Sequence, residues 1–224
     1  MNATPEAERL LRIAARAVGR AGLAHAYGHC SLRLDDRHYL VSPSKPLLLT
    51  GPGEKCHVLC INDPIPDHVL GEVRIHRELY RRRPDVNGIV RSMPPNVMVL
   101  AAHGIMPRPR HGFGTYFFPH PLMWDDPLLL RTDDAAAKLA EQLGDRNAIL
   151  MRGNGAVVAG DTIEQAVVLT WYLEDMARVE LAGRAAGLDS APTLDEASCT
   201  ARAIWQGAIA ERMFQYLSCE DIET

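Results

Sequence analysis

Residues 69–95 have the sequence VLGEVRIHRELYRRRPDVNGIVRSMPP and contain a helix, a strand and the start of a second helix. The pattern from Val69 to Arg82 is helical, and Pro84 ends the helix because proline has no backbone N–H and restricts the residue before it. Asn87 to Arg91 is a short strand. Its continuation at Pro94 cannot stay in a sheet, so we expect the chain to turn away and begin another helix there.

The rest of the chain alternates between the same two kinds of element. The other expected strands are 31–34, 38–42, 57–60, 148–151 and 156–158, and the other expected helices are 5–22, capped by Thr4, 132–143, 161–186, capped by Asp161, and 204–217. Glu174 and Arg178 have the i,i+4 spacing of a supportive ion pair. No linker or repeat divides residues 1–224. We expect a single α/β domain with a mixed, largely antiparallel central sheet covered by helices on both faces.

Composition excludes several classes of function. The 224 residues are 47% hydrophobic and 23% charged, with a net charge of -4 and nine scattered histidines, so no basic face is expected to bind nucleic acid. The chain has neither a signal-peptide pattern nor a run of eighteen apolar residues, which predicts a cytoplasmic protein without a membrane partner. Five cysteines without a CxxC pair do not indicate a disulfide framework or a zinc ribbon.

Four segments in order resemble the class II aldolase/adducin family. Residues 28–33, GHCSLR, resemble the family's Gly-(Asn/His)-x-Ser-x-Arg turn, and residues 71–86 resemble its Glu-x-x-x-His-x-x-x-Tyr-x-x-Arg-Pro-Asp-Val helix. Residues 90–95, VRSMPP, lie where the family has His-x-His-Pro, and residues 150–155, LMRGNG, lie where it has Arg-Gly-His-Gly. The resemblance spans most of the chain and implies a class II aldolase-like fold.

The resemblance also implies a metal site, but its three ligands are missing here. The family holds a divalent ion with the three histidines of those two motifs, and this sequence has Arg91, Met93 and Asn154 at these positions. A guanidinium has no lone pair to donate, a thioether is too soft for zinc, and a carboxamide oxygen is a weak ligand. We therefore expect neither a metal nor another cofactor.

The expected catalytic residues are Glu72, Arg91 and His29. Glu72 matches the glutamate that moves a proton in the family, and Arg91 stands where the cation stood, so its guanidinium can stabilise a carboxylate or a developing oxyanion. His29 would face the substrate as a proton carrier or as a hydrogen-bond donor. Each has a structural alternative: an exposed carboxylate, a surface ion pair and a turn histidine. His76, four residues after Glu72, is expected to pack or pair.

The same motifs indicate how a substrate binds. In the sugar-phosphate members of the family, one loop holds the phosphate group. This sequence has Lys45 where that loop has a glycine, and Leu70-Gly71 where those members have serines before the glutamate. A carboxylate therefore fits better than a phosphate ester. An aromatic substrate could stack near Tyr116. The expected substrate-binding residues are Ser31, Ser44, Lys45, Arg152, Asn154 and Tyr116.

These features favour a metal-independent carbon–carbon lyase, a decarboxylase or retro-aldolase, that acts on a small hydroxy- or keto-carboxylic acid through an enolate-type intermediate. Two alternatives remain open. One is a non-catalytic binding or assembly module of the adducin type. The other is a lyase with a rebuilt metal site that combines His29 and Glu72 with one of His103, His111 or His120. The resemblance further implies a homotetramer, and Trp205, Met213, Phe214 and Tyr216 are candidate contact residues.

Overall fold

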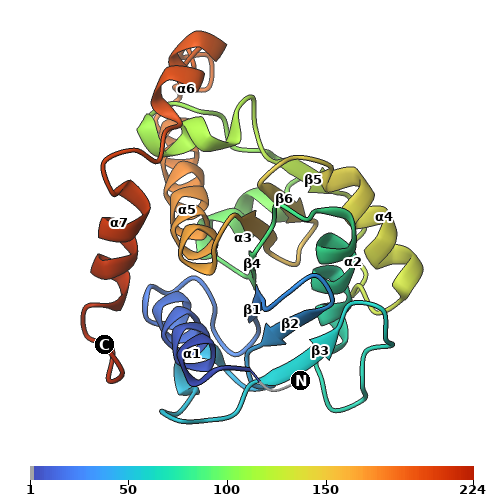
Figure 1. The fold of residues 1–224 in the computed structure, drawn as a ribbon. Helices are drawn as coiled ribbons and strands as arrows, with labels where there is room; N and C mark the ends of the chain where they lie inside the picture. Colours follow the sequence, from blue (N-terminus) through green and yellow to red (C-terminus); the bar gives the residue numbers. More distant parts are fainter. Residues whose placement is uncertain (1–2) are drawn as a thin grey trace.

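A seven-stranded sheet runs through the centre of the protein, in a computed structural model that describes residues 3–224 (Figure 1). The strands lie in the order β3-β2-β1-β4-β7-β6-β5, and all neighbours are antiparallel except β5 and β6. Their bounds are β1 His29–Arg33, β2 His38–Val41, β3 His57–Cys60, β4 Gly88–Ser92, β5 Leu122–Trp124, β6 Ala148–Met151 and β7 Ala156–Gly160. This confirms the expected mixed and largely antiparallel sheet.

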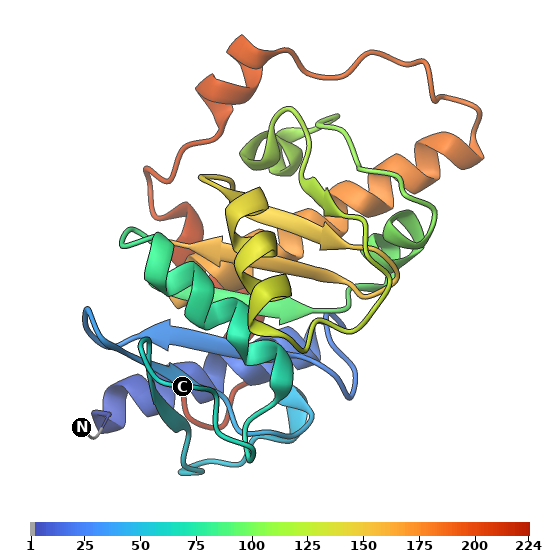
Figure 2. The ribbon, with the colours of Figure 1, turned by 90° about the vertical axis from the view of Figure 1, so that its right-hand side faces the viewer.

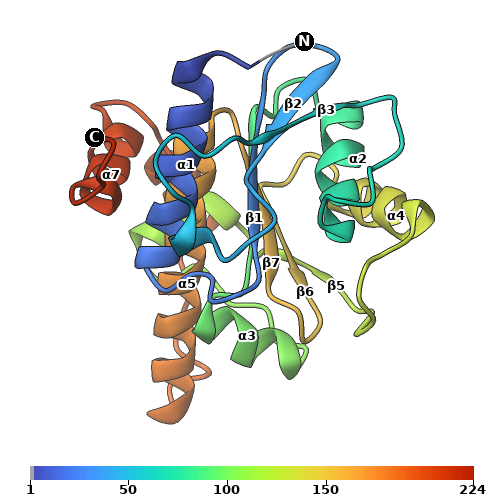
Figure 3. The same cartoon turned by 90° about the horizontal axis from the view of Figure 1, so that it is seen from below.

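Helices cover both faces of the sheet, as expected. Helices α1, α5 and α7 lie on one face and α2 and α4 on the other, which Figure 3 shows with the sheet nearly edge-on and Figure 2 shows from the α2 and α4 side. The helices are α1 Pro5–Arg20, α2 Arg74–Arg82, α3 Pro95–Ala102, α4 Asp133–Leu143, α5 Ile163–Ala185, α6 Glu196–Arg202 and α7 Ile209–Ser218. Each face buries its own apolar cluster, so β4 at the centre is buried throughout.

Local sequence signals explain most helix starts. The Thr4 side chain accepts a hydrogen bond from the Ala7 N–H and Pro5 begins α1, while Thr132 caps α4 in the same way. The helix expected from Val69 is shorter: a 3-10 turn at Gly71–Val73 precedes α2. That turn brings Glu72 to the start of α2.

Several expectations about the second half were wrong. Thr162, not Asp161, caps α5, because its hydroxyl accepts from the Gln165 N–H. Glu174 does not pair with Arg178: it accepts hydrogen bonds from two backbone N–H groups at the start of α3, and Arg178 pairs with Asp175 instead. The expected helix 204–217 begins only at Ile209, and neither β5 nor α6 was expected from the sequence.

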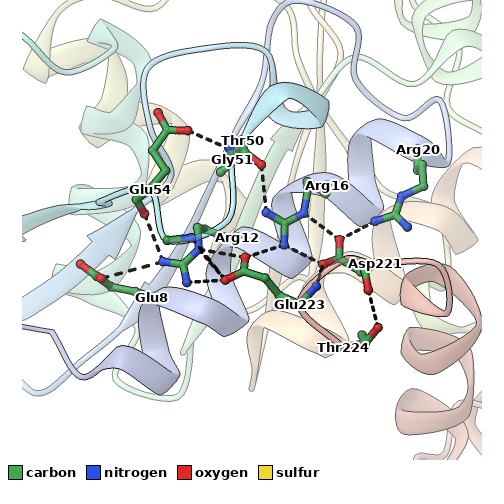
Figure 4. Close-up of polar contacts among 11 residues, drawn as sticks. Glu8, Arg12, Arg16, Arg20, Thr50, Gly51, Glu54, Asp221, Glu223 and Thr224 are labelled. Carbon is green, nitrogen blue, oxygen red and sulfur yellow. Dashed lines mark hydrogen bonds and ion pairs between the residues drawn. The ribbon is translucent and has the colours of Figure 1, made fainter.

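A cluster of ion pairs joins α1 to the C-terminal segment (Figure 4). Arg16 donates two hydrogen bonds to Asp221, with Nε–Oδ2 2.7 Å and Nη2–Oδ1 2.6 Å, and a third from Nη1 to the Thr50 carbonyl. Arg12 donates to Glu223 through Nε and Nη2 and to a backbone carbonyl through Nη1. These contacts fasten the loop after residue 50 and the end of the chain to the first helix.

No helix among residues 3–224 combines the length and apolar character that crossing a bilayer requires.

Candidate active site

Arg91, Glu72 and Asn154 meet at one end of the sheet. Arg91 lies in β4, Glu72 in the 3-10 turn before α2, and Asn154 in the turn between β6 and β7. Arg91 Nη2 lies 2.8 Å from Glu72 Oε2 and donates to Asn154 Oδ1 at 2.7 Å, and Asn154 Nδ2 donates to Glu72 Oε1 at 3.0 Å. The three side chains therefore form a closed ring of polar contacts.

Arg91 is buried but keeps unused hydrogen-bond donors. The residue is 3% exposed, and within residues 3–224 it bonds through Nη2 alone, while its buried Nε has no partner. Burial lowers the pKa of Arg91 and the neighbouring Glu72 carboxylate raises it, so the guanidinium stays charged. A fixed cation with donors to spare is suited to bind an anionic ligand.

The ring lines a cavity of about 760 Å³. Met93 lies in the same lining, so the three positions that correspond to the family's histidines do cluster in space. A Cβ on Gly155 would lie 2.0 Å from the Ser92 carbonyl oxygen, which means that only glycine lets the β6–β7 turn approach β4 this closely. That approach places Asn154 beside Arg91.

The donor set at this place does not fit a divalent metal. The Arg91 guanidinium faces the oxygens of both Glu72 and Asn154, and the third position offers only the Met93 thioether. Residues 3–224 also contain no group of three His, Cys, Asp or Glu side chains arranged to hold an ion.

Three of the four histidines considered for a rebuilt metal site lie outside the cavity lining. His103 contacts the Val99 carbonyl oxygen through Nδ1, His111 pairs with Asp175, and His120 contacts the Pro121 carbonyl oxygen. Only His29, of the four histidines that this alternative names, reaches the cavity.

His29 also lines the cavity. It is the cross-strand neighbour of Arg91 in the antiparallel pair of β1 and β4. The Nδ1 atom of His29 lies 2.8 Å from His76 Nε2, and the Nε2 atom of His29 is buried without a hydrogen-bond partner in the described part of the chain, residues 3–224. Burial lowers the pKa of both histidines, that of His29 well below its ordinary value and that of His76 to about 3, and the charge of Arg91 acts in the same direction. Both imidazoles are therefore neutral at physiological pH.

The structure brings some expected substrate-binding residues to the cavity and leaves others away from it. Ser44, Lys45 and Asn154 line it, and Lys45 also pairs with Glu54 at 3.0 Å. Ser31 is fully buried behind the lining and contacts His76 and Tyr80.

Arg152 and Tyr116 lie elsewhere. Arg152 is outside the lining and pairs with Asp125 at 2.6 Å, because the glycine turn directs only the side chain at 154 toward β4. Tyr116 donates to the Ile204 carbonyl and packs against Trp205 and Tyr172, an aromatic contact within the fold.

Among the lining residues that sequence reasoning missed are Tyr27, Leu129 and Arg131. Arg131 is exposed, lies close to Gly71 and has no ion pair among residues 3–224. It directly precedes the α4 cap, and nothing in the pattern of that loop indicates that it turns toward the cavity. These residues add a cation and two apolar groups at the cavity mouth.

The sequence of residues 9–181 matches the family model described as class II aldolase and adducin N-terminal domain. The chain belongs to this family. It is 29% identical over 200 residues to the 3,4-dihydroxyphthalate decarboxylase of Arthrobacter keyseri, which covers 81% of this chain and 80% of that protein. A second 3,4-dihydroxyphthalate decarboxylase, from Terrabacter sp. (strain DBF63), is 26% identical and covers 81% of this chain and 83% of its own length.

The fold is also that of solved class II aldolase structures. L-fuculose 1-phosphate aldolase from Glaciozyma antarctica PI12 superimposes with a TM-score of 0.78 and 20% identity over 98% of this chain and 94% of that chain. At this identity the likeness shows the fold alone. The family expected from the four motifs is confirmed.

Proposed function

We propose that the protein is a carbon–carbon lyase that decarboxylates a small hydroxylated carboxylic acid without a metal ion. The observation that carries this is the buried Arg91 guanidinium, which stands at the position of one of the family's metal-binding histidines and still has free donors beside Glu72. The decarboxylase names of the relatives support the reaction class.

Decarboxylation needs a cation for developing negative charge and a group that moves a proton. Glu72 takes the proton of a substrate hydroxyl group and leaves an enolate-type oxygen beside Arg91. Glu72 then gives this proton to the carbon that bears the carboxylate, so that the oxygen becomes a carbonyl. The bond to the carboxylate carbon breaks, carbon dioxide leaves, and the electron pair returns to the enolate-type oxygen beside Arg91. Water supplies the proton that restores the hydroxyl. Retro-aldol cleavage uses the same intermediate, so the same residues serve both reactions.

The cavity mouth indicates the kind of acid that fits. Lys45 and Arg131 are cations in the lining, and Tyr27, Leu70 and Leu129 give it apolar surface. A planar hydroxylated aromatic acid combines a negative charge for the cations with a face for the apolar side chains. Where the acid has a second carboxylate, as a dihydroxyphthalate has, Arg131, which has no competing ion pair among residues 3–224, binds the carboxylate that is not lost.

The alternative, a non-catalytic binding module, predicts different residues at the former metal position. Drift away from catalysis would replace the polar groups at the former metal position with apolar ones. Here Arg91, Asn154 and Glu72 remain polar, bond to one another and face a cavity. This arrangement favours an enzyme.

Assembly into a homotetramer, implied by the family resemblance, remains a proposal, as does a cytoplasmic location. Of the four candidate contact residues, Met213, Phe214 and Trp205 pack against the protein's own apolar clusters, and Tyr216 is 68% exposed. Light scattering of the purified protein tests the oligomeric state. A monomer at micromolar concentration would contradict it.

The test of function is carbon dioxide release from a panel of hydroxybenzoates, dihydroxyphthalates and keto acids after exhaustive dialysis against a chelator. We expect turnover of at least one hydroxylated aromatic acid that a chelator does not reduce. Arg131→Ala is expected to raise KM about tenfold and leave kcat near that of the wild type, because it removes one binding charge remote from the reacting bond. Activity that appears only when a metal ion is added would overturn the metal-free reaction.

A further inference from the structure

A chain of hydrogen bonds leads from the cavity wall into the core. His29 Nδ1 lies 2.8 Å from His76 Nε2, His76 Nδ1 lies 2.6 Å from Ser31 Oγ, and Ser31 Oγ lies 2.8 Å from the Tyr80 hydroxyl oxygen. All four residues are at most 2% exposed. The outer end of this hydrogen-bond chain, His29 Nε2, is a buried atom that has no partner among residues 3–224, in a residue that lines the cavity.

The direction in which the hydrogen bonds of this chain are donated decides which tautomer His29 adopts. Each contact contains one hydrogen, because both histidines are neutral. In the outward direction Tyr80 donates to Ser31, Ser31 to His76 Nδ1, and His76 Nε2–H to His29 Nδ1. The hydrogen of His29 must then be on Nε2. In the inward direction His29 carries its hydrogen on Nδ1 and offers a lone pair to the cavity.

The inward direction leaves the Tyr80 hydroxyl hydrogen without an acceptor. Ser31 is the one hydrogen-bond partner of that hydroxyl among residues 3–224, and inward it would already be the donor. A buried donor without a partner costs about 1–3 kcal/mol. The outward direction leaves one free donor, His29 Nε2–H, in a residue that lines the cavity, so a ligand bound there can accept from it.

We propose that Tyr80, Ser31 and His76 are positioning residues that hold His29 as its Nε2–H tautomer, so that a neutral imidazole offers the substrate a hydrogen-bond donor and no base. The group that faces His29 is then an acceptor, a carboxylate or an enolate oxygen held between His29 and Arg91. The inference rests on the proposed function for the identity of this ligand, but not for the tautomer.

The same chain makes His29 a poor proton carrier. If His29 lost its Nε2 proton, the hydrogen-bond chain could replace it only by passing a proton from Tyr80 through Ser31 and His76. That transfer would leave a phenolate at Tyr80 in the core. Burial raises the pKa of Tyr80, so this phenolate is disfavoured. Of the two roles that the sequence left open for His29, the structure therefore favours the hydrogen-bond donor.

The direct test is the tautomer itself, observed by two-bond 1H–15N correlation spectra of protein labelled with 15N-histidine. The signals are assigned with the variants His29→Gln and His76→Gln. We expect both histidines to be protonated at Nε2 and not at Nδ1, without change between pH 5.5 and pH 8. A proton on His29 Nδ1, or an imidazolium in this range, would overturn the inference whether or not a substrate is known.

A pair of serine variants tests whether the chain sets the tautomer. Ser31→Ala interrupts the chain and should produce a second population with His29 protonated at Nδ1. Ser92→Ala is the matched control, since Ser92 is equally buried in the neighbouring strand and its hydroxyl has no hydrogen-bond partner within residues 3–224. The control should retain one tautomer. A single Nε2–H form in both variants would show that the chain does not determine it.

The role of donor is tested by activity. His29→Gln keeps an amide donor that cannot carry protons, and His29→Ala keeps none. We expect kcat of His29→Gln within about tenfold of wild type and a loss of about a hundredfold or more in His29→Ala. Equal losses in both variants would make His29 a proton carrier and contradict the inference. Absence of any turnover by the wild type would instead contradict the proposed function and leave the tautomer as measured.

Discussion

Two groups of buried arginines in this protein have opposite surroundings. Arg12 and Arg16 of α1 are each 5% exposed, and all three nitrogens of each guanidinium donate to a carboxylate or a carbonyl (Figure 4). Arg91 is 3% exposed, but it bonds through one nitrogen and faces a cavity. Burial and ion pairing alone therefore do not distinguish a structural arginine from a functional one. What distinguishes Arg91 is that some of its N–H donors remain unused beside a cavity.

The largest expected effect is on stability, from Arg16→Ala. The substitution removes the bidentate partner of the buried Asp221 carboxylate, which keeps Arg20 as its other ion pair, so we expect a loss near the lower end of the about 3–5 kcal/mol that breaking a buried ion pair costs. Urea denaturation should show this loss in the free energy of unfolding. Arg9→Ala on the same helix is the control, since Arg9 is exposed, and its effect should stay within about 0.5 kcal/mol. Equal stability of both variants would mean that the cluster does not hold the end of the chain.

Arg91→Ala and Glu72→Gln should have the opposite profile, with a large effect on turnover and a folded protein. Loss of a positioned oxyanion donor or of the proton-moving group is expected to reduce kcat about a hundredfold or more, which corresponds to about 2.7 kcal/mol. Steady-state kinetics on the substrate identified by carbon dioxide release measures this. Arg178→Ala, a change in an exposed ion pair on α5, should stay within a few-fold of the wild type. Near wild-type turnover in both site variants would place the active site elsewhere.

The triple variant Arg91→His, Met93→His and Asn154→His tests whether the cavity is the former metal site. Three imidazoles around one point and a water are enough for a zinc site of the catalytic type. We expect about one zinc ion per chain by elemental analysis, stabilisation of about 2.7 kcal/mol at a hundred times Kd, and no such binding by the wild type or the single variants. A folded triple variant that ignores zinc would show that the three positions cannot converge on an ion.

The smallest effect is the pH dependence of the α1 cluster. Hydrogen bonds from Arg12 lower the pKa of Glu223 to about 2, and, although burial opposes it, Arg16 holds the pKa of Asp221 below its ordinary value. Because these pKa values are lower in the folded state, the stabilisation is complete above about pH 4.5 and is lost as the pH falls toward 2. Unfolding midpoints of the wild type and Glu223→Gln should differ at pH 7 and converge as the pH falls to about 2. A constant difference would exclude this linkage.

Much of the fold could be predicted because local chemistry sets it. Pro84 and Pro94 end a helix and a strand because proline cannot continue either, and Thr4 caps the helix that follows it. What failed depends on contacts between distant segments. β5 has three residues and pairs with one neighbour, too short for a periodic pattern, and Glu174 is drawn away from Arg178 by the backbone N–H groups of α3.

The candidate site, too, could be predicted only where sequence motifs mark it. The motifs predicted a common site for Glu72, Arg91, His29 and Asn154, and these four residues line one cavity. The carbon–carbon lyase expected from them agrees with the decarboxylase names of the relatives. Sequence could not show that Ser31 lies behind the wall, that Arg152 turns to Asp125, or that Arg131 reaches the mouth. Such placements are set by the packing of loops, on which residue type gives little information.

The position of β4 has a consequence for how the protein folds. This strand joins β1, from the first half of the chain, to β7, from the second, and the contacts of Asn154 with Arg91 and Glu72 span 63 and 82 residues. Contacts between residues so far apart in sequence close large loops and form slowly. The hairpin of β1 and β2 and the long helix α5 require no such closure. During refolding, far-ultraviolet circular dichroism should therefore recover before ligand binding, so that regained activity reports completion of the whole sheet.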